Sequence, residues 1–255
     1  MRTSTRPTLF GLLLLTAVSA GLMLGCESAA EREEGKPKNN PVAKEKKEHV
    51  ESKKTALGKN VFLEVLPNQQ RRVLISGEIC LREGQLELFL CRKQTKEHEA
   101  IVSAEVDART IHAALIAAGA KEGSPVSFVP KYRPASGTAI KVSVEYKDKD
   151  KLVTVPAQSW IKNAKTNKLL ESDWVFAGSR LVDNPLDPGK KYYLANDGDV
   201  ICISNFETAL LDLPIKSPKD DAERFFIANT ERIPPLETKV VVILEPVLEV
   251  GRDKK

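Results

Sequence analysis

The chain has 255 residues, of which 39 are Lys or Arg and 35 are Asp or Glu, so its formal net charge is +4. The excess lies near the N-terminus, because residues 61–255 hold 28 basic and 28 acidic residues. Nucleic-acid binding depends on a clustered basic excess, and a neutral domain lacks one. We therefore expect no nucleic-acid partner, and a chain of this length is enough for one domain with its own core.

The N-terminal residues have the organisation of a bacterial lipoprotein precursor. Two arginines precede an apolar stretch at residues 9–24, and Gly25 stands directly before Cys26. A charged start, an apolar middle and a small residue at the cleavage site are typical of a secretory signal. A Cys directly after that site is the residue that lipoprotein processing modifies. We predict a signal peptide at residues 1–25 and lipidation of Cys26, with Glu27 favouring export to the outer membrane.

Two alternatives for this segment stay open. A transmembrane anchor needs about 20 apolar residues, and the stretch is shorter and contains Thr16 and Ser19. Cleavage after Val18-Ser19-Ala20 would instead release a soluble, secreted protein. Our expectation is a protein anchored by its lipid to the cell envelope and facing the periplasm, where thiols tend to oxidise.

A charged segment follows the lipidation site. Residues 27–60 contain nine Lys or Arg, seven Asp or Glu and no aromatic side chain. A segment with so little apolar surface to bury stays disordered. We predict that residues 26–60 are a flexible tether, which would hold the domain about 30 Å from the lipid.

Residues 61–250 are predicted to form one globular domain rich in strands. Residues 73–81 and 86–91 have strand character on either side of Glu83-Gly84, which predicts a two-residue hairpin loop. Further strands are predicted at 101–106, 125–130, 139–146, 152–155, 173–177, 192–195, 200–204 and 239–244.

Three segments are predicted to be helical. Asp107 is a good N-cap for residues 108–118, and Gly119 suits the position after the last turn. Shorter helices are predicted at 206–213 and 219–227. Strands that outnumber helices without regular alternation favour an α+β fold, with a mainly antiparallel sheet and two or three short helices.

The residues with the most chemical potential lie between Cys91 and His112. They form a candidate binding or catalytic surface: Cys91, Lys93, Lys96, Glu97, His98, Glu99 and His112. A thiol beside a histidine or a lysine can become a reactive thiolate. Cys80, Cys91, His98 and His112 are also acceptable zinc ligands by type, but their wide spacing is unlike that of structural zinc sites. We therefore predict no metal and no cofactor.

The cysteines leave a disulfide open. The predicted hairpin would place Cys80 about 13 Å along the strand from Cys91, which is too far for a bridge. The alternatives are that Cys202 pairs with Cys80 or Cys91, or that the three are buried free thiols. Trp160 and Trp174 are interpreted as core anchors rather than as the lining of a ligand cleft.

Five short motifs resemble those of the YdjY-domain family of bacterial envelope proteins, over about residues 60–246. They are Gly77-Glu78-Ile79-Cys80, the run from Cys91 to Glu99 with its Lys-Glu-His-Glu, Ile111-His112-Ala113-Ala114-Leu115, Trp174-Val175-Phe176-Ala177-Gly178-Ser179 and Ile203-Ser204-Asn205-Phe206. Gln94 stands where the resemblance leads us to expect Gly, which should stiffen that turn. Iron–sulfur ligation needs closely spaced cysteines that this chain lacks. The resemblance implies an envelope location and no particular reaction.

Two classes of function follow. The first is a non-enzymatic lipoprotein, anchored in the membrane by its lipid, whose domain binds an envelope protein or a small ligand. The second is a thiol- or metal-dependent site built on Cys91, His98 and His112. We favour the first, because no catalytic signature surrounds the cysteine.

Overall fold

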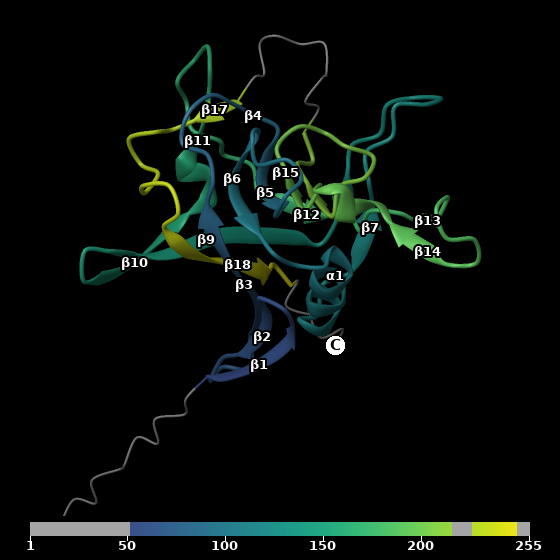
Figure 1. Ribbon diagram of the computed structural model, residues 1–255, viewed down its shortest axis with the longest axis horizontal. Helices are drawn as coiled ribbons and strands as arrows, with labels where there is room; N and C mark the ends of the chain where they lie inside the picture. The colour runs from purple at the N-terminus through teal and green to yellow at the C-terminus, as the bar shows by residue number, and fades with distance from the viewer. Residues whose placement is uncertain (1–51, 216–225, 249–255) are drawn as a thin grey trace, which may run out of the picture. The chain divides into compact units, whose positions relative to one another are not determined.

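The computed structural model describes residues 52–215 and 226–248 (Figure 1). The predicted signal peptide, Cys26 and residues 26–51 of the predicted tether lie outside this range, as do residues 219–225 of a predicted helix. Across the part of the chain that is described, no helix is long and apolar enough to cross a membrane.

The described residues form eighteen strands, one α-helix and two short 3₁₀ helices. The strands are β1 (Lys53–Gly58), β2 (Val61–Val65), β3 (Arg71–Ile79), β4 (Gln85–Leu86), β5 (Leu88–Arg92), β6 (Ala100–Ala104), β7 (Glu122–Ser124), β8 (Ser136–Gly137), β9 (Ala139–Asp148), β10 (Lys151–Pro156), β11 (Ile161–Asn163), β12 (Trp174–Phe176), β13 (Leu181–Asp183), β14 (Lys191–Tyr193), β15 (Ile201–Cys202), β16 (Leu211–Asp212), β17 (Phe226–Ala228) and β18 (Lys239–Pro246). The helix is α1 (Ala108–Ala117), and the 3₁₀ helices are η1 (Ala157–Trp160) and η2 (Leu194–Asp197).

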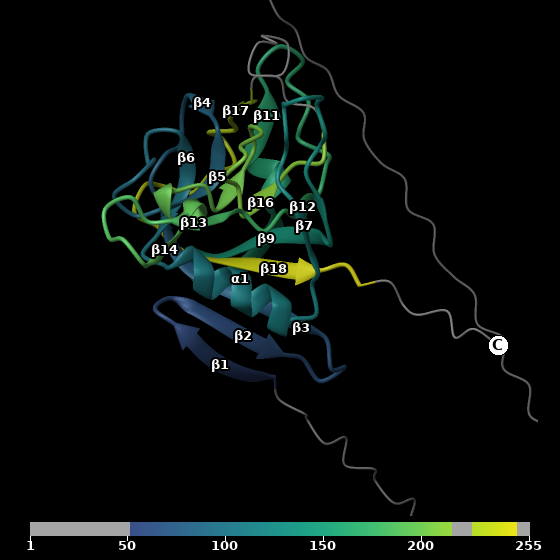
Figure 2. The same cartoon turned by 90° about the vertical axis from the view of Figure 1, so that its right-hand side faces the viewer.

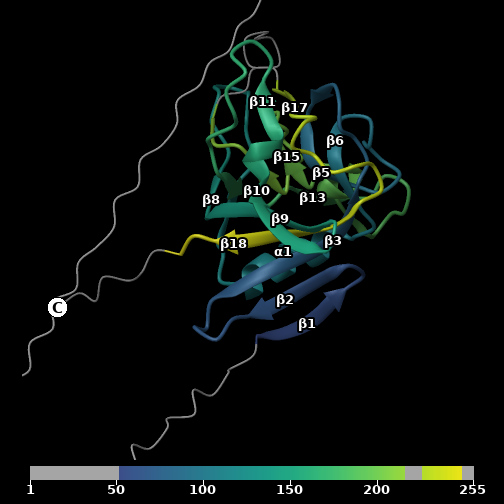
Figure 3. The ribbon, with the colours of Figure 1, turned by 90° about the vertical axis from the view of Figure 1, so that its left-hand side faces the viewer.

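Eight strands of the main sheet close into a barrel. Their order is β3-β18-β9-β12-β16-β15-β5-β6, and β6 pairs back onto β3. All pairings are antiparallel except β5 with β6 and β15 with β16. Strands β2 and β1 continue outward from β3, and β10 continues from β9, as Figure 3 shows. Helix α1 packs on β2 and β3 (Figure 2).

Aromatic side chains fill the core of the barrel. Trp160 and Trp174 are almost completely buried, and the ring of Phe89 lies 6.2 Å from the first and 6.0 Å from the second. The indole Nε1–H of Trp174 donates a 2.7 Å hydrogen bond to the carbonyl oxygen of Cys202. Both tryptophans are therefore core residues: burial satisfies both apolar rings, and the hydrogen bond satisfies the polar edge of Trp174.

The predicted α+β class is wrong, because the fold is mostly β with a single α-helix. That helix is the one predicted at 108–118, and the Asp107 carboxylate caps it by accepting from the backbone N–H of Arg109. Residues 206–213 are not helical. Leu211 and Asp212 form strand β16 between β12 and β15 instead. Barrel closure supplies backbone partners on both edges there, which outweighs a modest local helix propensity.

The predicted hairpin between residues 73–81 and 86–91 is also wrong. Strand β6 lies between β3 and β5 and pairs with both. All five residues of β6 are buried, and a strand buried on both faces is most stable when neighbours satisfy both of its edges. The Leu86 segment pairs with β17 instead.

Part of the predicted tether forms a strand. Residues 53–58 form β1, which pairs with β2 although every one of its side chains is exposed. Composition predicted disorder because the segment has little to bury. Pairing with a preformed sheet edge needs only the backbone groups, and exposed lysines are typical of such an edge strand.

Candidate functional site

The loop after β5 is held to the barrel by Lys96. Its ammonium lies 2.7 Å from Oδ1 of Asp199 and 4.7 Å from the ring centre of Phe206. The Asp199 side chain is only 5% exposed and also accepts from the hydroxyl of Thr208 at 2.5 Å. Burial alone would lower the pKa of Lys96, and the neighbouring Asp199 carboxylate reverses this and raises it. The motif from Cys91 to Glu99 and the motif from Ile203 to Phe206 therefore meet here, and their contact is structural.

The turn of this loop is built around Gln94. Its backbone φ is +64°, and its N–H donates to the carboxylate of Glu97 at 2.5 Å. Thr95 adds a second bond by donating to the Arg92 carbonyl at 2.6 Å. Glycine adopts a left-handed backbone without strain, whereas a side chain costs about 1 kcal/mol there. This explains why Gly was expected at position 94.

We expect Gln94→Gly to raise the free energy of unfolding by up to about 1 kcal/mol, because relief of the left-handed strain exceeds the entropy that a glycine adds to the unfolded chain. Urea denaturation of the variant and of Gln94→Ala, which keeps the strain, measures this difference. Destabilisation of Gln94→Gly relative to Gln94→Ala would contradict the account.

The two histidines of the candidate surface have different environments. The side chain of His98 is 77% exposed, and its nearest charged neighbour is Glu99 at 3.8 Å. His112 lies on α1 between Tyr193 and Glu122. Its Nδ1 is 2.9 Å from the Tyr193 hydroxyl, and its Nε2 is 3.1 Å from the Glu122 carboxylate.

The His112 contacts form a chain of hydrogen bonds that fixes α1. The Tyr193 hydroxyl donates to the carbonyl of Gly178 at 2.7 Å, so its oxygen is the acceptor for Nδ1 of His112. Burial raises the pKa of Tyr193. His112 also packs edge-on against Phe176, with ring centres 4.9 Å apart. This histidine therefore holds α1 against the Trp174–Ser179 motif.

The structure carries the three cysteines of the domain as free thiols. Cys91 and Cys202 are fully buried and belong to the same apolar cluster, whereas Cys80 is half-buried. Within residues 52–215 and 226–248, neither histidine hydrogen bonds to Cys91, and no group of three or more His, Cys, Asp or Glu side chains could hold a metal ion. The sequence placed Cys91, His98 and His112 on one surface, but the fold does not bring them together.

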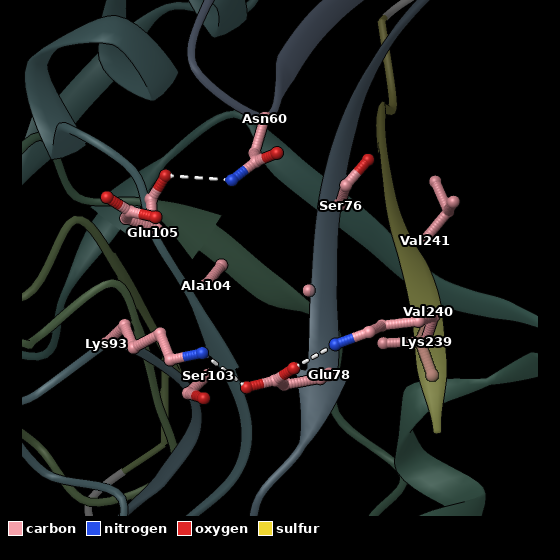
Figure 4. Close-up of a pocket in the computed structure, with 11 residues that line it drawn as sticks. Asn60, Ser76, Glu78, Lys93, Ser103, Ala104, Glu105, Lys239, Val240 and Val241 are labelled. Atoms are coloured by element: carbon pink, nitrogen blue, oxygen red, sulfur yellow. Dashed lines mark hydrogen bonds and ion pairs between the residues drawn. The ribbon is translucent and has the colours of Figure 1, made fainter. Parts of the chain in front are cut away.

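A pocket that the sequence did not reveal opens beside Lys93. Strand β3 pairs with β2 up to Ile75 and with β6 from Glu78 onward, both along the same edge. The pocket lies at this fork and has a volume of about 400 Å³. We call it the fork pocket; Figure 4 shows its lining residues, which are Asn60, Ser76, Gly77, Glu78, Lys93, Ser103, Ala104, Glu105, Lys239, Val240 and Val241.

The charged groups of the fork pocket centre on Glu78. Lys93 donates to its carboxylate at 2.6 Å, and Lys239 reaches the other carboxylate oxygen from the opposite side (Figure 4). The hydrogen bonds from Lys239 and Lys93 lower the pKa of Glu78. Two ammonium groups thus share one carboxylate, which leaves this group of three with a net charge of +1.

Gly77 allows β6 to lie close to β3 at the base of the pocket. A Cβ atom at this position would lie 2.8 Å from the carbonyl oxygen of Ser103 and 3.0 Å from a methyl of Val102. The absence of a side chain therefore lets β6 approach β3 and close the barrel. Only Lys93 of the predicted surface lines this pocket. The fork depends on pairings between distant segments, so no local pattern could have indicated it.

Comparison with known families identifies the chain. The model of the YdjY domain matches residues 63–245, so the protein belongs to the YdjY-domain family, as the motifs indicated. Searches among curated proteins and among solved structures gave no match.

Proposed function

We propose that this YdjY-domain protein is an envelope lipoprotein, lipidated at Cys26, whose domain binds a small anionic ligand in the fork pocket. The proposal for the N-terminus depends on the apolar stretch that ends at Gly25-Cys26. The segment from Cys26 to the start of β1 would then serve as the tether to the membrane.

The observation that carries the ligand proposal is the sharing of Glu78 by two lysines. An ammonium group has three N–H donors, and Lys93 and Lys239 each use one on Glu78. The remaining donors are available to a ligand, and the net positive charge of the three groups favours an anion.

The remaining lining residues suit a polar ligand. Ser76, Ser103 and Asn60 add neutral hydrogen-bonding groups, while Glu105 is already paired with Lys59. The volume of about 400 Å³ is within the usual range for small-molecule sites. A carboxylate or a phosphate can take the open lysine donors, so these are the ligand chemistries that we propose.

The binding test uses inorganic phosphate and succinate as probes. We expect either anion to shift the amide NMR signals of Ser76, Gly77 and Ala104, and Lys93→Met or Lys239→Met to weaken that binding roughly 10-fold or more, as loss of a charged hydrogen bond predicts. Lys151→Met removes an exposed lysine on β10 and is the matched control. The proposal would be contradicted if these amide signals did not shift, or if Lys151→Met weakened binding as much as Lys93→Met or Lys239→Met does.

Lipidation is tested separately in the full chain. A labelled fatty acid should be incorporated into the native protein and not into Cys26→Ser, and only the native protein should sediment with membranes. If Cys26→Ser carries no label but stays with the membranes, the apolar stretch acts as an uncleaved anchor. Release of Cys26→Ser from the membranes supports lipidation over ordinary signal cleavage only if the fatty-acid label is lost as well.

Cys91 is poorly suited to the alternative site that would combine it with His98 and His112. Cys91 is fully buried, and its pKa is raised by the neighbouring Cys80 and by burial. A buried thiol that holds its proton is a poor nucleophile.

A further inference from the structure

We propose that the hairpin between β7 and β8 docks the domain on the surface of an anionic phospholipid membrane. Residues 125–135 connect these two strands, which pair at Ser124 and Ser136, and we call this segment the finger. In Figure 1 the finger projects beyond β7. The inference rests on the proposed anchoring at Cys26, but it does not depend on ligand binding in the fork pocket.

The end of the finger exposes adjacent apolar side chains. Val129 is 78% exposed and Phe128 is 42% exposed, and Pro130 beside them is also exposed. The ring of Tyr132 lies 6.0 Å from the ring of Phe128, so the tip carries two aromatic rings. Contact with an apolar phase would remove these groups from water, which is favourable.

Hydrogen bonds within the finger hold its shape. The backbone groups of Ser127 and Arg133 bond to each other at 3.0 and 2.8 Å, and the Ser127 hydroxyl donates to the carbonyl of Val129 at 3.0 Å. Val126 and Ala135 are buried at the base. Docking therefore does not need to order a loose loop, and the Val129 carbonyl keeps a partner when it leaves water.

Two basic residues lie directly behind the apolar tip. Lys131 and Arg133 are exposed, and neither side chain has an ion-pair partner among the residues that the structure describes. Residues 124–136 contain no Asp or Glu, and the carboxylate of Glu122, at the base of the finger, is 3.1 Å from His112. The finger thus has a local charge of +2, which complements a negatively charged surface.

A lipid surface fits this tip better than a protein does. A stable protein interface buries about 800 Å² on each partner, whereas a tip with a few exposed apolar side chains offers only a small area. A membrane needs no matching shape. Aromatic rings are favoured at the boundary between acyl chains and headgroups, and the stems of Lys131 and Arg133 can lie along that boundary while their charges contact phosphate groups.

The proposed lipid anchor makes a weak contact sufficient. Residues 27–52 would give the predicted tether a root-mean-square span of about 30 Å and a maximum reach of about 90 Å. The tip would therefore stay near the membrane and be able to meet it. Because the contact is then intramolecular, a few side chains are enough, and a covalent lipid and a basic patch reinforce each other.

The β13–β14 hairpin is the matched comparison. Leu186 in its loop is 92% exposed, but the charges around it are balanced, because Asp183 pairs with Lys191 and Asp187 with Lys190, both at 2.6 Å. Exposure of an apolar side chain without a basic excess gives no attraction to anionic lipid. We therefore expect Leu186 to stay in water.

A tryptophan at the tip tests the contact in the full, anchored protein. Trp160 and Trp174 are almost completely buried, so Phe128→Trp adds a fluorophore that reports on the tip. The protein is reconstituted into vesicles of phosphatidylglycerol and phosphatidylcholine, with bromine on the acyl chains as the quencher. We expect the added emission to be quenched and shifted to shorter wavelength, and the emission of Leu186→Trp to be quenched much less.

Charge variants test the role of the anionic lipid. In the Phe128→Trp protein, Lys131→Gln together with Arg133→Gln should lower the ratio of docked to undocked tips roughly 10-fold or more. Vesicles of phosphatidylcholine alone should have a similar effect. Lys149→Gln together with Lys151→Gln, which removes two exposed lysines of the β9–β10 hairpin, is the matched control and should change the ratio little.

Sedimentation with the vesicles is measured in the same samples, so that anchoring and docking are observed separately. Protein that sediments while the tryptophan at the tip stays unquenched would overturn the docking proposal and leave the anchor intact. Equal quenching of Leu186→Trp, or equal quenching of the tip without phosphatidylglycerol, would also overturn it. Protein that does not sediment contradicts the anchoring at Cys26, and the docking proposal fails with it.

Discussion

Replacing Asp212 by Asn should make the protein progressively more stable than the native chain as the pH rises from 5 to 8. Asp212 lies in strand β16 with no exposed surface. One carboxyl oxygen accepts from the Leu213 N–H at 2.8 Å and from the Asn205 amide at 3.3 Å, but the other has no partner among the described residues. Burial is the largest effect on this group and raises the pKa of Asp212 to about 7.

The sign follows from the protons that each state binds. Between the ordinary pKa of an unfolded Asp, about 3.9, and the folded value of about 7, the native carboxyl keeps a proton that the unfolded chain has lost. Stability of the native chain therefore falls across this window and is constant above it. Asn at this position does not titrate, so its advantage should grow by roughly 2 to 3 kcal/mol between pH 5 and pH 8.

Urea denaturation of both proteins at several pH values measures this difference. Asp150→Asn, in an exposed turn, is the matched control and should show no such trend. A constant difference between Asp212→Asn and the native chain would mean that the buried carboxyl does not change its charge in this range.

Replacing Lys96 by Ala should lower the free energy of unfolding by roughly 2 to 4 kcal/mol, since loss of one partner leaves the other charge buried and unpaired. The Asp199 carboxylate would keep only the Thr208 hydroxyl, and Phe206 would lose the ammonium over its ring.

A double-mutant cycle separates this pairing from packing. Lys96→Ala with Asp199→Asn should recover at least about half of the loss, because no buried charge is then left without a partner. Lys93→Ala is the matched control, as its ion pair with Glu78 is more exposed and should contribute less than about 1 kcal/mol. Equal losses for Lys93→Ala and Lys96→Ala, or no recovery in the double variant, would show that burial at Asp199 is not the cause.

These predictions change the interpretation of the family motifs. The Lys-Glu-His-Glu run suggested a binding surface, but Lys96 and Glu97 hold the loop in place, and His112 holds the helix against Tyr193. Within the run that begins at Cys91, it is Lys93 that reaches the fork pocket. The motifs therefore mark both the scaffold and part of the proposed fork pocket.

Sequence patterns predicted the structure correctly where interactions between neighbouring residues determine it. Asp107 and Gly119 bound helix α1 as predicted, because capping depends on the nearest backbone groups. The resemblance led us to expect a turn with Gly at position 94, and the structure shows that the backbone of Gln94 is left-handed there. Family membership and the strand-rich character of the domain also followed from the residues alone.

Tertiary structure decided everything that depends on which strands become neighbours. The insertion of β6 between β3 and β5 replaced the predicted hairpin. The same insertion created the fork pocket, and pairing with β12 and β15 made residues 211–212 a strand. Sequence alone determined the short-range elements, because capping and turn preferences act within a few residues. Barrel closure decided the sites, because pairing between distant strands depends on the burial of both faces and on the satisfaction of every strand edge.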